Sequence, residues 1–85
     1  MPYTIELKKR VYKELEALTE ENQQRILRDL SELLENPFKQ GVIRLTGEES
    51  YRSRVGDYRI VFEVDIAIQV IIVMRIAHRS EVYKD

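Results

Sequence analysis

The spacing of apolar residues divides the chain into an N-terminal strand, two helices and a group of C-terminal strands. Residues 3–7 alternate between apolar and polar side chains, which is typical of a strand with one buried face. Apolar residues then recur at helical intervals and predict an amphipathic helix over residues 9–18. A second helix is predicted from Thr19, a favourable N-cap, to Asn36-Pro37, because the residue before proline disfavours helical geometry. The short link between the helices predicts an antiparallel helical hairpin.

The second half of the chain has the period-2 pattern of strands joined by tight turns. Residues 51–55 and 57–64 alternate on either side of a Gly56-Asp57 turn signal. A further strand is expected to open at Ile66 or Ile68 and to run to Ile76, with the even-numbered residues 68–76 on one face. Because Ile71 and Val73 on the other face are also apolar, we expect this strand to be central. Residues 38–50 are the longest irregular stretch, and within it residues 42–45 fit either a short extended piece or a loop anchor.

This order of elements predicts an α+β fold in a single domain that spans residues 1–85. The helical hairpin is expected to pack on one face of a mostly antiparallel four-stranded sheet, which leaves the other face partly open. A length of 85 residues is too short for two domains. The side chains on the open face are therefore the first candidates for function.

The composition limits which classes of protein and which kinds of binding site the sequence can form. Apolar residues make up 44% and charged residues 34%, which fits a small globular domain rather than a disordered or membrane chain. The longest apolar run, Val70 to Met74, is far shorter than the ~20 residues of a membrane helix, and no signal-peptide pattern begins the chain. Without cysteine, and with His78 as the one histidine, no metal or cofactor site is expected. The absence of cysteine fits a cytoplasmic protein, and the net charge of −1 means that any anion site must come from local placement of charge.

Arginine is unevenly distributed, with five in residues 48–85 and four in the rest of the chain. By strand parity Arg52 and Arg54 share a face, and Arg59 joins them if its apolar neighbours face the helices. Two further arginines, Arg75 and Arg79, lie at or just after the end of the last strand. Guanidinium groups suit phosphate oxygens, so a cluster of them predicts a phosphate-binding patch. The alternative is a solvated face of ion pairs, since residues 48–85 carry six positive and seven negative charges.

Two other polar side chains invite a chemical role. Histidine is the side-chain type suited to proton transfer near neutral pH, although a lone His78 near a strand end is more often a surface residue. Tyr83 fits either a packing anchor or a group that stacks on a base. Neighbouring Glu48 and Glu49 are disfavoured as a paired-carboxylate site because adjacent strand residues point apart.

These features resemble the RelE/ParE superfamily of toxins from toxin–antitoxin modules. The resemblance covers nearly the whole chain, from the Tyr3–Leu7 strand and the Asn36-Pro37 helix stop to the two blocks at residues 51–64 and 75–83. It implies a RelE-like fold and a cytoplasmic endoribonuclease (an mRNA interferase) that inhibits translation by cutting messenger RNA in the ribosomal A site. RelE-type toxins use the RNA's own 2′-hydroxyl as nucleophile, without a metal or another cofactor. A cognate antitoxin, the ribosome and mRNA are the implied partners.

The resemblance also implies roles for individual residues. Arg59 and Arg79 match family arginines that would stabilise the charge on the phosphate, and Tyr83 matches the C-terminal tyrosine. Arg52 and Arg54 match a basic pair that binds RNA, and Arg75 is expected beside them. The catalytic candidates are Arg59, Arg79, Tyr83 and His78, with His78 as general acid or base.

Two features keep other functions open. RelE-type toxins are usually strongly basic, whereas this chain has a net charge of −1. The ParE branch shares the fold but inhibits DNA gyrase and lacks the ribonuclease residues. The basic residues and Tyr83 favour the RelE branch over a gyrase inhibitor or an inactive relative that binds only an antitoxin.

Overall fold

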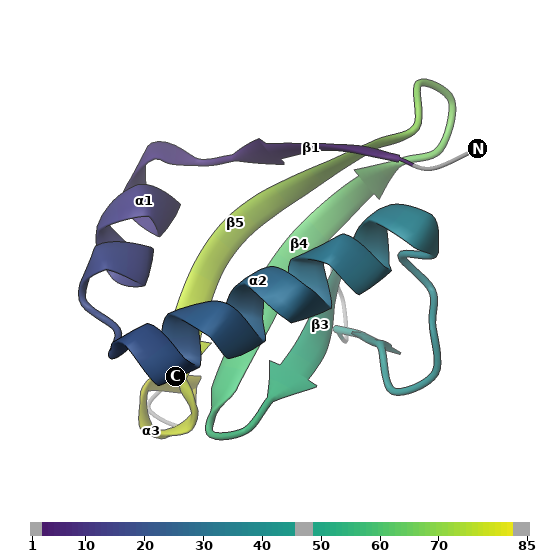
Figure 1. Ribbon diagram of the computed structural model, residues 1–85. Helices are drawn as coiled ribbons and strands as arrows, with labels where there is room; N and C mark the ends of the chain where they lie inside the picture. Colours follow the sequence, from purple (N-terminus) through teal and green to yellow (C-terminus); the bar gives the residue numbers. More distant parts are fainter. Residues whose placement is uncertain (1–2, 46–48, 83–85) are drawn as a thin grey trace.

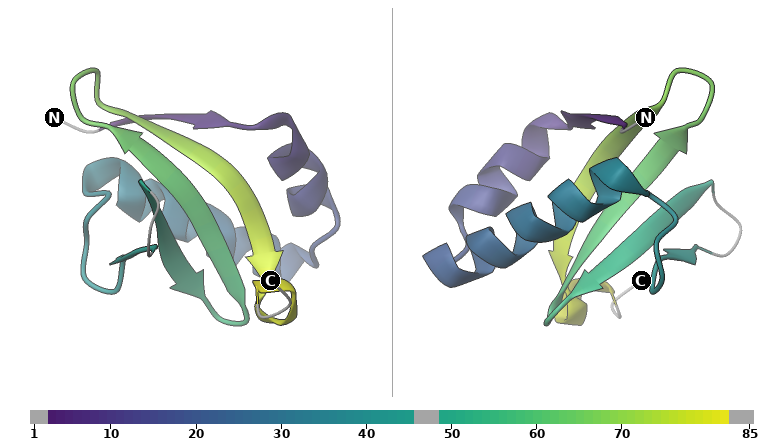
Figure 2. Two further views of the ribbon diagram at one scale, coloured as in Figure 1. Left: turned by 180° about the vertical axis from the view of Figure 1, so that it is seen from behind. Right: turned by 45° about the vertical axis from the view of Figure 1, so that its right-hand side comes forward.

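The protein is a single twisted sheet with a short and a long helix on one side (Figure 1). The computed structural model describes residues 3–45 and 49–82. The elements in chain order are β1 (Thr4–Leu7), α1 (Lys9–Glu16), α2 (Glu20–Glu35), β2 (Ile43–Arg44), β3 (Ser50–Val55), β4 (Tyr58–Asp65), β5 (Val70–His78) and α3 (Arg79–Val82). Seen from behind, the strands lie in front of α1 and α2 (Figure 2). Among the described helices, none is long and apolar enough to cross a membrane.

The predictions of an α+β fold and of a mostly antiparallel sheet are confirmed, and the sheet has one strand more than predicted. The strand order is β1-β5-β4-β3-β2, so there are five strands rather than four. The extra strand is β2, whose Ile43 and Arg44 pair with Arg52 and Tyr51 of β3. The sheet is mixed because β1 runs parallel to β5 while the other pairs are antiparallel. Tight hairpins make the β3–β4 and β4–β5 pairs antiparallel, whereas the helices between β1 and the other strands leave the direction of β1 unconstrained.

The predicted facing of β5 is wrong for its first half because the strand contains a bulge. Val61 pairs with Arg75, but Phe62 pairs with Val73, so Met74 is an extra residue on β5. A bulge residue shifts the alternation of side chains by one position. Ile71 and Val73 therefore lie in the core together with Ile76, and the even-numbered residues 70 and 72 lie on the other face.

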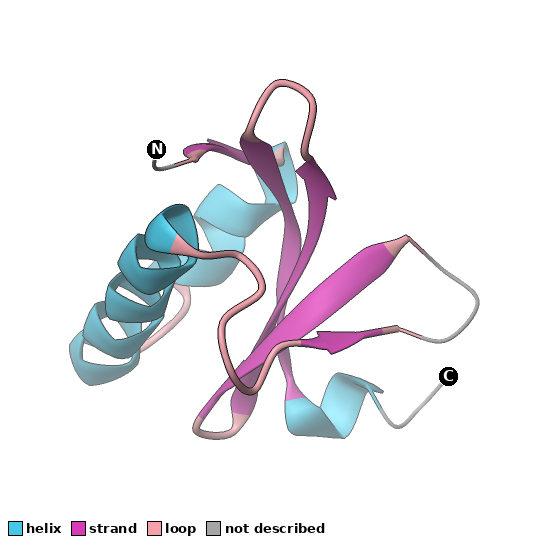
Figure 3. Ribbon diagram, turned by 90° about the vertical axis from the view of Figure 1, so that its right-hand side faces the viewer, coloured by secondary structure: helices cyan, strands magenta, loops and turns pink. Residues whose placement is uncertain are grey.

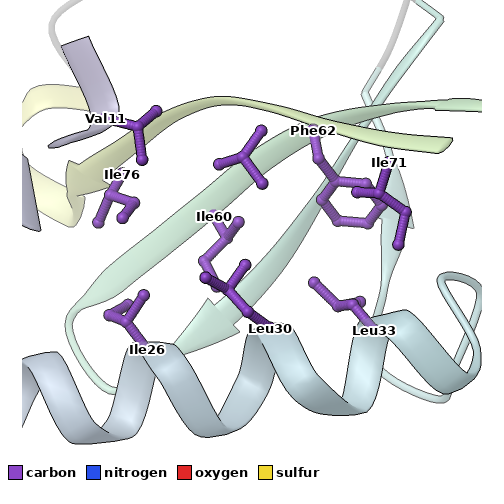
Figure 4. Close-up of a cluster of buried hydrophobic side chains, with 9 residues drawn as sticks. Val11, Ile26, Leu30, Leu33, Ile60, Phe62, Ile71 and Ile76 are labelled. Carbon is purple, nitrogen blue, oxygen red and sulfur yellow. The ribbon is translucent and has the colours of Figure 1, made fainter. Parts of the chain in front are cut away.

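The helices form where the sequence predicts them. Thr19 caps α2 by accepting a hydrogen bond from the Asn22 backbone N–H at 3.2 Å, and α2 ends at Glu35, just before Asn36-Pro37. From their short connection the helices diverge, with α1 beside β5 and α2 crossing β4 and β3 (Figure 1). Their apolar faces meet the sheet in a core that Figure 4 shows from the side. The buried cluster comprises Val11, Ile26, Leu30, Leu33, Ile60, Phe62, Ile71, Val73 and Ile76.

One carboxylate from α1 accepts a hydrogen bond from the backbone of β5. β1 pairs with β5 only over residues 70–73, so the later part of this edge has no strand partner. There the Ile76 backbone N–H donates to Glu14 Oε1 at 2.7 Å, and Glu14 Oε2 accepts from Arg10 Nε at 3.1 Å. Glu14 therefore connects α1 to the strand segment that carries Arg75.

Candidate functional site

The pairing of the central strands places four arginines on the sheet face that points away from the helices. Arg54 of β3 lies directly opposite Arg59 of β4, and Arg52 lies opposite Val61, which in turn lies opposite Arg75 of β5. Directly paired residues on neighbouring strands point to the same face. The predicted gathering of these residues therefore agrees with the register. We call Arg52, Arg54, Arg59 and Arg75 the arginine face.

The arginine face combines buried and exposed cations. Arg59, on the central strand β4, is only 7% exposed, and the Nε atoms of Arg59 and Arg75 are inaccessible to solvent. Arg54, near the end of β3, is exposed. Charges that are partly withdrawn from water act on an anion more strongly than fully solvated ones. Arg59 is therefore held in place by its surroundings, whereas Arg54 can adjust to a ligand.

Arg79 lies at the same end of the sheet but at its margin. It opens α3, where its backbone N–H donates to the Asp57 carbonyl oxygen at 2.8 Å. Its guanidinium Nη1 is 3.8 Å from the Asp57 carboxylate, and both side chains are 66% exposed. Such an exposed pair is weak, so an anion could compete for Arg79.

His78, a catalytic candidate from the sequence, does not lie among the arginines. β5 continues through residue 78, so alternation places His78 opposite Tyr58 and on the helix side, while Ala77 lies opposite Arg59. The His78 ring contacts the Tyr58 ring edge to face at 5.2 Å and borders a groove of about 250 Å³ with Glu14 and Leu18. Its Nδ1 accepts a hydrogen bond from the Ser80 backbone N–H at 3.2 Å, which places the proton of the neutral ring on Nε2.

Other sequence candidates fall outside what the structure describes or form no cluster. Tyr83 and Glu48 lie outside the described residues. Within residues 3–45 and 49–82, no group of three or more histidine or acidic side chains is placed to hold a metal ion.

Two grooves meet at the edge of β3, and the one that lies between α2 and β3 was not predicted from the sequence. A groove of about 340 Å³ between α2 and β3 is lined by Arg25, Arg28 and Arg54, among others. A groove of about 320 Å³ nearer the arginine face includes Lys39, Arg52 and Arg54. The three-residue spacing of Arg25 and Arg28 was the available signal, because it places both on one side of a helix. Only the packing of α2 against β3 brings that side next to Arg54.

A polar network beneath these grooves fastens α2 to β3. The Ser53 hydroxyl donates to Asp29 Oδ2 at 2.6 Å, and Lys39 Nζ bonds both Asp29 Oδ1 and Glu32 Oε1, the latter at 2.6 Å. Burial lowers the pKa of Lys39, but its bonds to Asp29 and Glu32 outweigh that effect and hold the pKa above its ordinary value. The hydrogen bond from Lys39 and its charge also lower the pKa of Glu32.

Comparison with known proteins places this geometry in context. Residues 5–83 match the family model of the ParE toxin of the type II toxin–antitoxin system parDE. A Methanocaldococcus jannaschii protein assigned as the toxin RelE1 is 33% identical over an alignment of 89 positions. The alignment covers 100% of this chain and 99% of that protein. RelE in the archaeal RelE–RelB complex from Pyrococcus horikoshii superposes with a TM-score of 0.83 at 30% identity, over 93% of this chain and 97% of that one. A double arginine-to-alanine mutant of Escherichia coli RelE in the free state gives a TM-score of 0.79 at 27% identity, over 99% and 93%.

Proposed function

Because the chain belongs to the RelE/ParE superfamily of toxins from type II toxin–antitoxin systems, we propose that it cuts messenger RNA on the ribosome. The observation that carries this proposal is the arginine face, on which the nearly buried Arg59 lies directly opposite the exposed Arg54. A cluster of guanidinium groups on an open sheet face suits the phosphodiester of an RNA strand.

The chemistry is a transesterification within the RNA. The 2′-oxygen attacks the adjacent phosphorus and loses its proton, and the bond from phosphorus to the 5′-oxygen of the next nucleotide breaks. The products are a 2′,3′-cyclic phosphate and a 5′-hydroxyl, and the latter takes up a proton. Negative charge grows on the non-bridging oxygens in the transition state, and fixed cations at those oxygens lower the barrier.

The arginine face supplies charge and orientation in this scheme, and it does not supply a base. Arg59 and Arg75 hold the scissile phosphate, Arg52 and Arg54 hold the flanking backbone, and Arg79 reaches the phosphate from the start of α3. Arginine stays protonated and cannot accept a proton. The proton of the 2′-hydroxyl therefore goes to solvent or to a group from outside this face, and Tyr83 hydrogen-bonds the hydroxyl or stacks on a base.

Primer extension on a message translated in extract tests the proposal. Addition of the protein is expected to create new ends within codons, and Arg59→Ala should remove them while leaving the thermal unfolding transition in place. Lys13→Ala is the matched control, because it removes an exposed cation from α1, which packs on the other side of the sheet. If translation stops without new ends, the protein is not a nuclease.

A cognate antitoxin is the partner that we propose for this toxin. The related RelE proteins from Pyrococcus horikoshii and Methanococcus jannaschii were crystallised as complexes with RelB. Purification of this protein with the product of the neighbouring gene would test the assignment, since a cognate antitoxin should co-purify and suppress mRNA cleavage.

Inhibition of DNA gyrase is the second candidate, because the matching family model is that of the ParE toxin and the net charge is −1. A supercoiling assay decides between the two functions. Loss of supercoiling at saturating protein, together with intact mRNA in the translation extract, would favour gyrase.

A further inference from the structure

A cationic groove lies between α2 and β3, next to the arginine face, with which it shares Arg54. Arg25, Arg28 and Arg54 line it, and its volume is about 340 Å³. Arg25 reaches across from the helix to the β3–β4 turn, because a Cβ atom placed on Gly56 would lie 3.2 Å from Arg25 Nη1. The groove therefore has guanidinium groups on both of its walls.

The carboxylates of this groove are already engaged within the protein. Asp29 is bonded by Ser53 and Lys39, and Glu32 is bonded by Lys39. Among the described residues Arg54 forms no salt bridge, and Arg28 interacts with Glu32 through its charge without a close ion pair. Arg25 has only an exposed 3.8 Å contact with Glu21, which contributes little. The three arginines that line the groove outnumber its two carboxylates, Asp29 and Glu32, so the groove attracts anions.

The groove is continuous with the arginine face through Arg54. β2 pairs with β3 at residues 51 and 52, so the later half of β3 has no strand partner on this side among the described residues (Figure 3). At this edge Arg54 lines both the groove under α2 and the groove that contains Arg52. Arg54 also lies directly opposite Arg59. Cationic side chains therefore run from the arginine face, around the edge of β3, to α2.

We propose that the groove between α2 and β3 binds the sugar–phosphate backbone of the RNA strand next to the linkage held by the arginine face. This inference rests on the proposed nuclease function and adds Arg25 and Arg28 to the RNA-binding residues. A positively charged groove that follows the backbone is a general way to hold a single strand without reading its sequence. Few apolar side chains line the groove, which favours a phosphate backbone over an amphipathic protein segment.

The test compares the affinities of the protein for RNA of two lengths. The probes are a labelled trinucleotide and a labelled dodecanucleotide, both with 2′-O-methyl groups that prevent cleavage, and binding is followed by fluorescence anisotropy. The groove variant is the double substitution Arg25→Gln with Arg28→Gln. The matched control is Lys9→Gln with Lys13→Gln, which removes the same charge from exposed positions of α1.

The wild-type protein should bind the dodecanucleotide more tightly than the trinucleotide. In the groove variant the ratio of the two affinities should fall roughly tenfold. For the dodecanucleotide, the slope of log Kd against log salt concentration should be smaller by about 1.4 in the groove variant. This difference corresponds to two lost phosphate contacts, at ~0.7 each on a single strand. The control should retain both the length advantage and the salt slope.

Three results would overturn the inference. Equal losses in the groove variant and the control would mean that net charge alone is responsible. An unchanged length advantage in the groove variant, while Arg59→Ala still weakens binding, would refute the groove but leave the nuclease function intact. Weaker antitoxin binding without any change in RNA binding would assign the groove to the antitoxin. If Arg59→Ala also has no effect on RNA binding or cleavage, the proposed function itself fails.

Discussion

The hydrogen bond from the Ile76 backbone to Glu14 allows a sharp test of how α1 supports the strand that carries Arg75. Replacing Glu14 with alanine removes the acceptor that lies 2.7 Å from the Ile76 N–H. Glu14 is 19% exposed and Ile76 is 4% exposed, so water has poor access to the donor that remains. An unsatisfied buried donor costs about 1–3 kcal/mol. For a domain of this size, whose total stability is of order 5–10 kcal/mol, that loss is substantial.

Thermal or urea unfolding measures this cost. At about 2 kcal/mol, Glu14→Ala should lower Tm by roughly 8–16 °C. Glu14→Gln keeps an oxygen acceptor and should recover most of the loss. Arg10→Ala separates the ion pair from the backbone bond, because Arg10 is 60% exposed and its pair should contribute less than about 1 kcal/mol. Equal Tm values for Glu14→Ala and the exposed control Glu16→Ala would refute the reasoning.

Two further predictions concern the sheet and its attachment to α2. Deletion of Met74 should preserve cooperative unfolding in circular dichroism, because it removes the bulge and leaves Val73 and Ile76 facing the core, with Arg75 between them on the other face. Loss of cooperative unfolding in this deletion variant would contradict the assignment of Met74 as the extra residue. The ion pairs of Lys39 should stabilise the protein most between pH 4.5 and pH 10.5. The pKa of Glu32 is lowered in the folded protein, so its contribution should be lost as the pH falls below 4.5. The pKa of Lys39 is raised, so its contribution should be lost as the pH rises above 10.5. When Tm is measured against pH, Lys39→Gln should have a lower Tm than wild type near neutrality. Its Tm should fall less than that of wild type toward acidic or alkaline pH. Parallel Tm curves for the two proteins would contradict this account.

The sequence was sufficient for the features that depend on local patterns. Thr19 and Asn36-Pro37 set the ends of α2, and the Gly56-Asp57 turn fixes the β3–β4 register, which aligns Arg54 with Arg59. Much of the arginine face follows from that one turn and from strand parity.

The features that the sequence did not reveal depend on contacts between distant segments. An extra residue such as Met74 leaves the same apolar composition on β5, so its effect on facing becomes visible only when β5 pairs with β4. His78 was expected beyond a strand that ends at Ile76, but β5 continues for two more residues and places His78 on the helix side of the sheet. Arg25 acquires its position next to Arg54 only through the packing of α2 on β3, which no local pattern encodes.

Single-turnover cleavage of mRNA on programmed ribosomes tests most directly whether the arginine face performs the chemistry. The comparison is between wild type, Arg59→Ala and His78→Ala, whose side chains lie on opposite faces of the sheet. We predict that Arg59→Ala slows cleavage roughly 10²–10³-fold, as expected for the loss of one fixed donor to a developing oxyanion, and that His78→Ala stays within a few fold of wild type. Loss of cleavage in the His78 variant, with full activity in the Arg59 variant, would contradict the account.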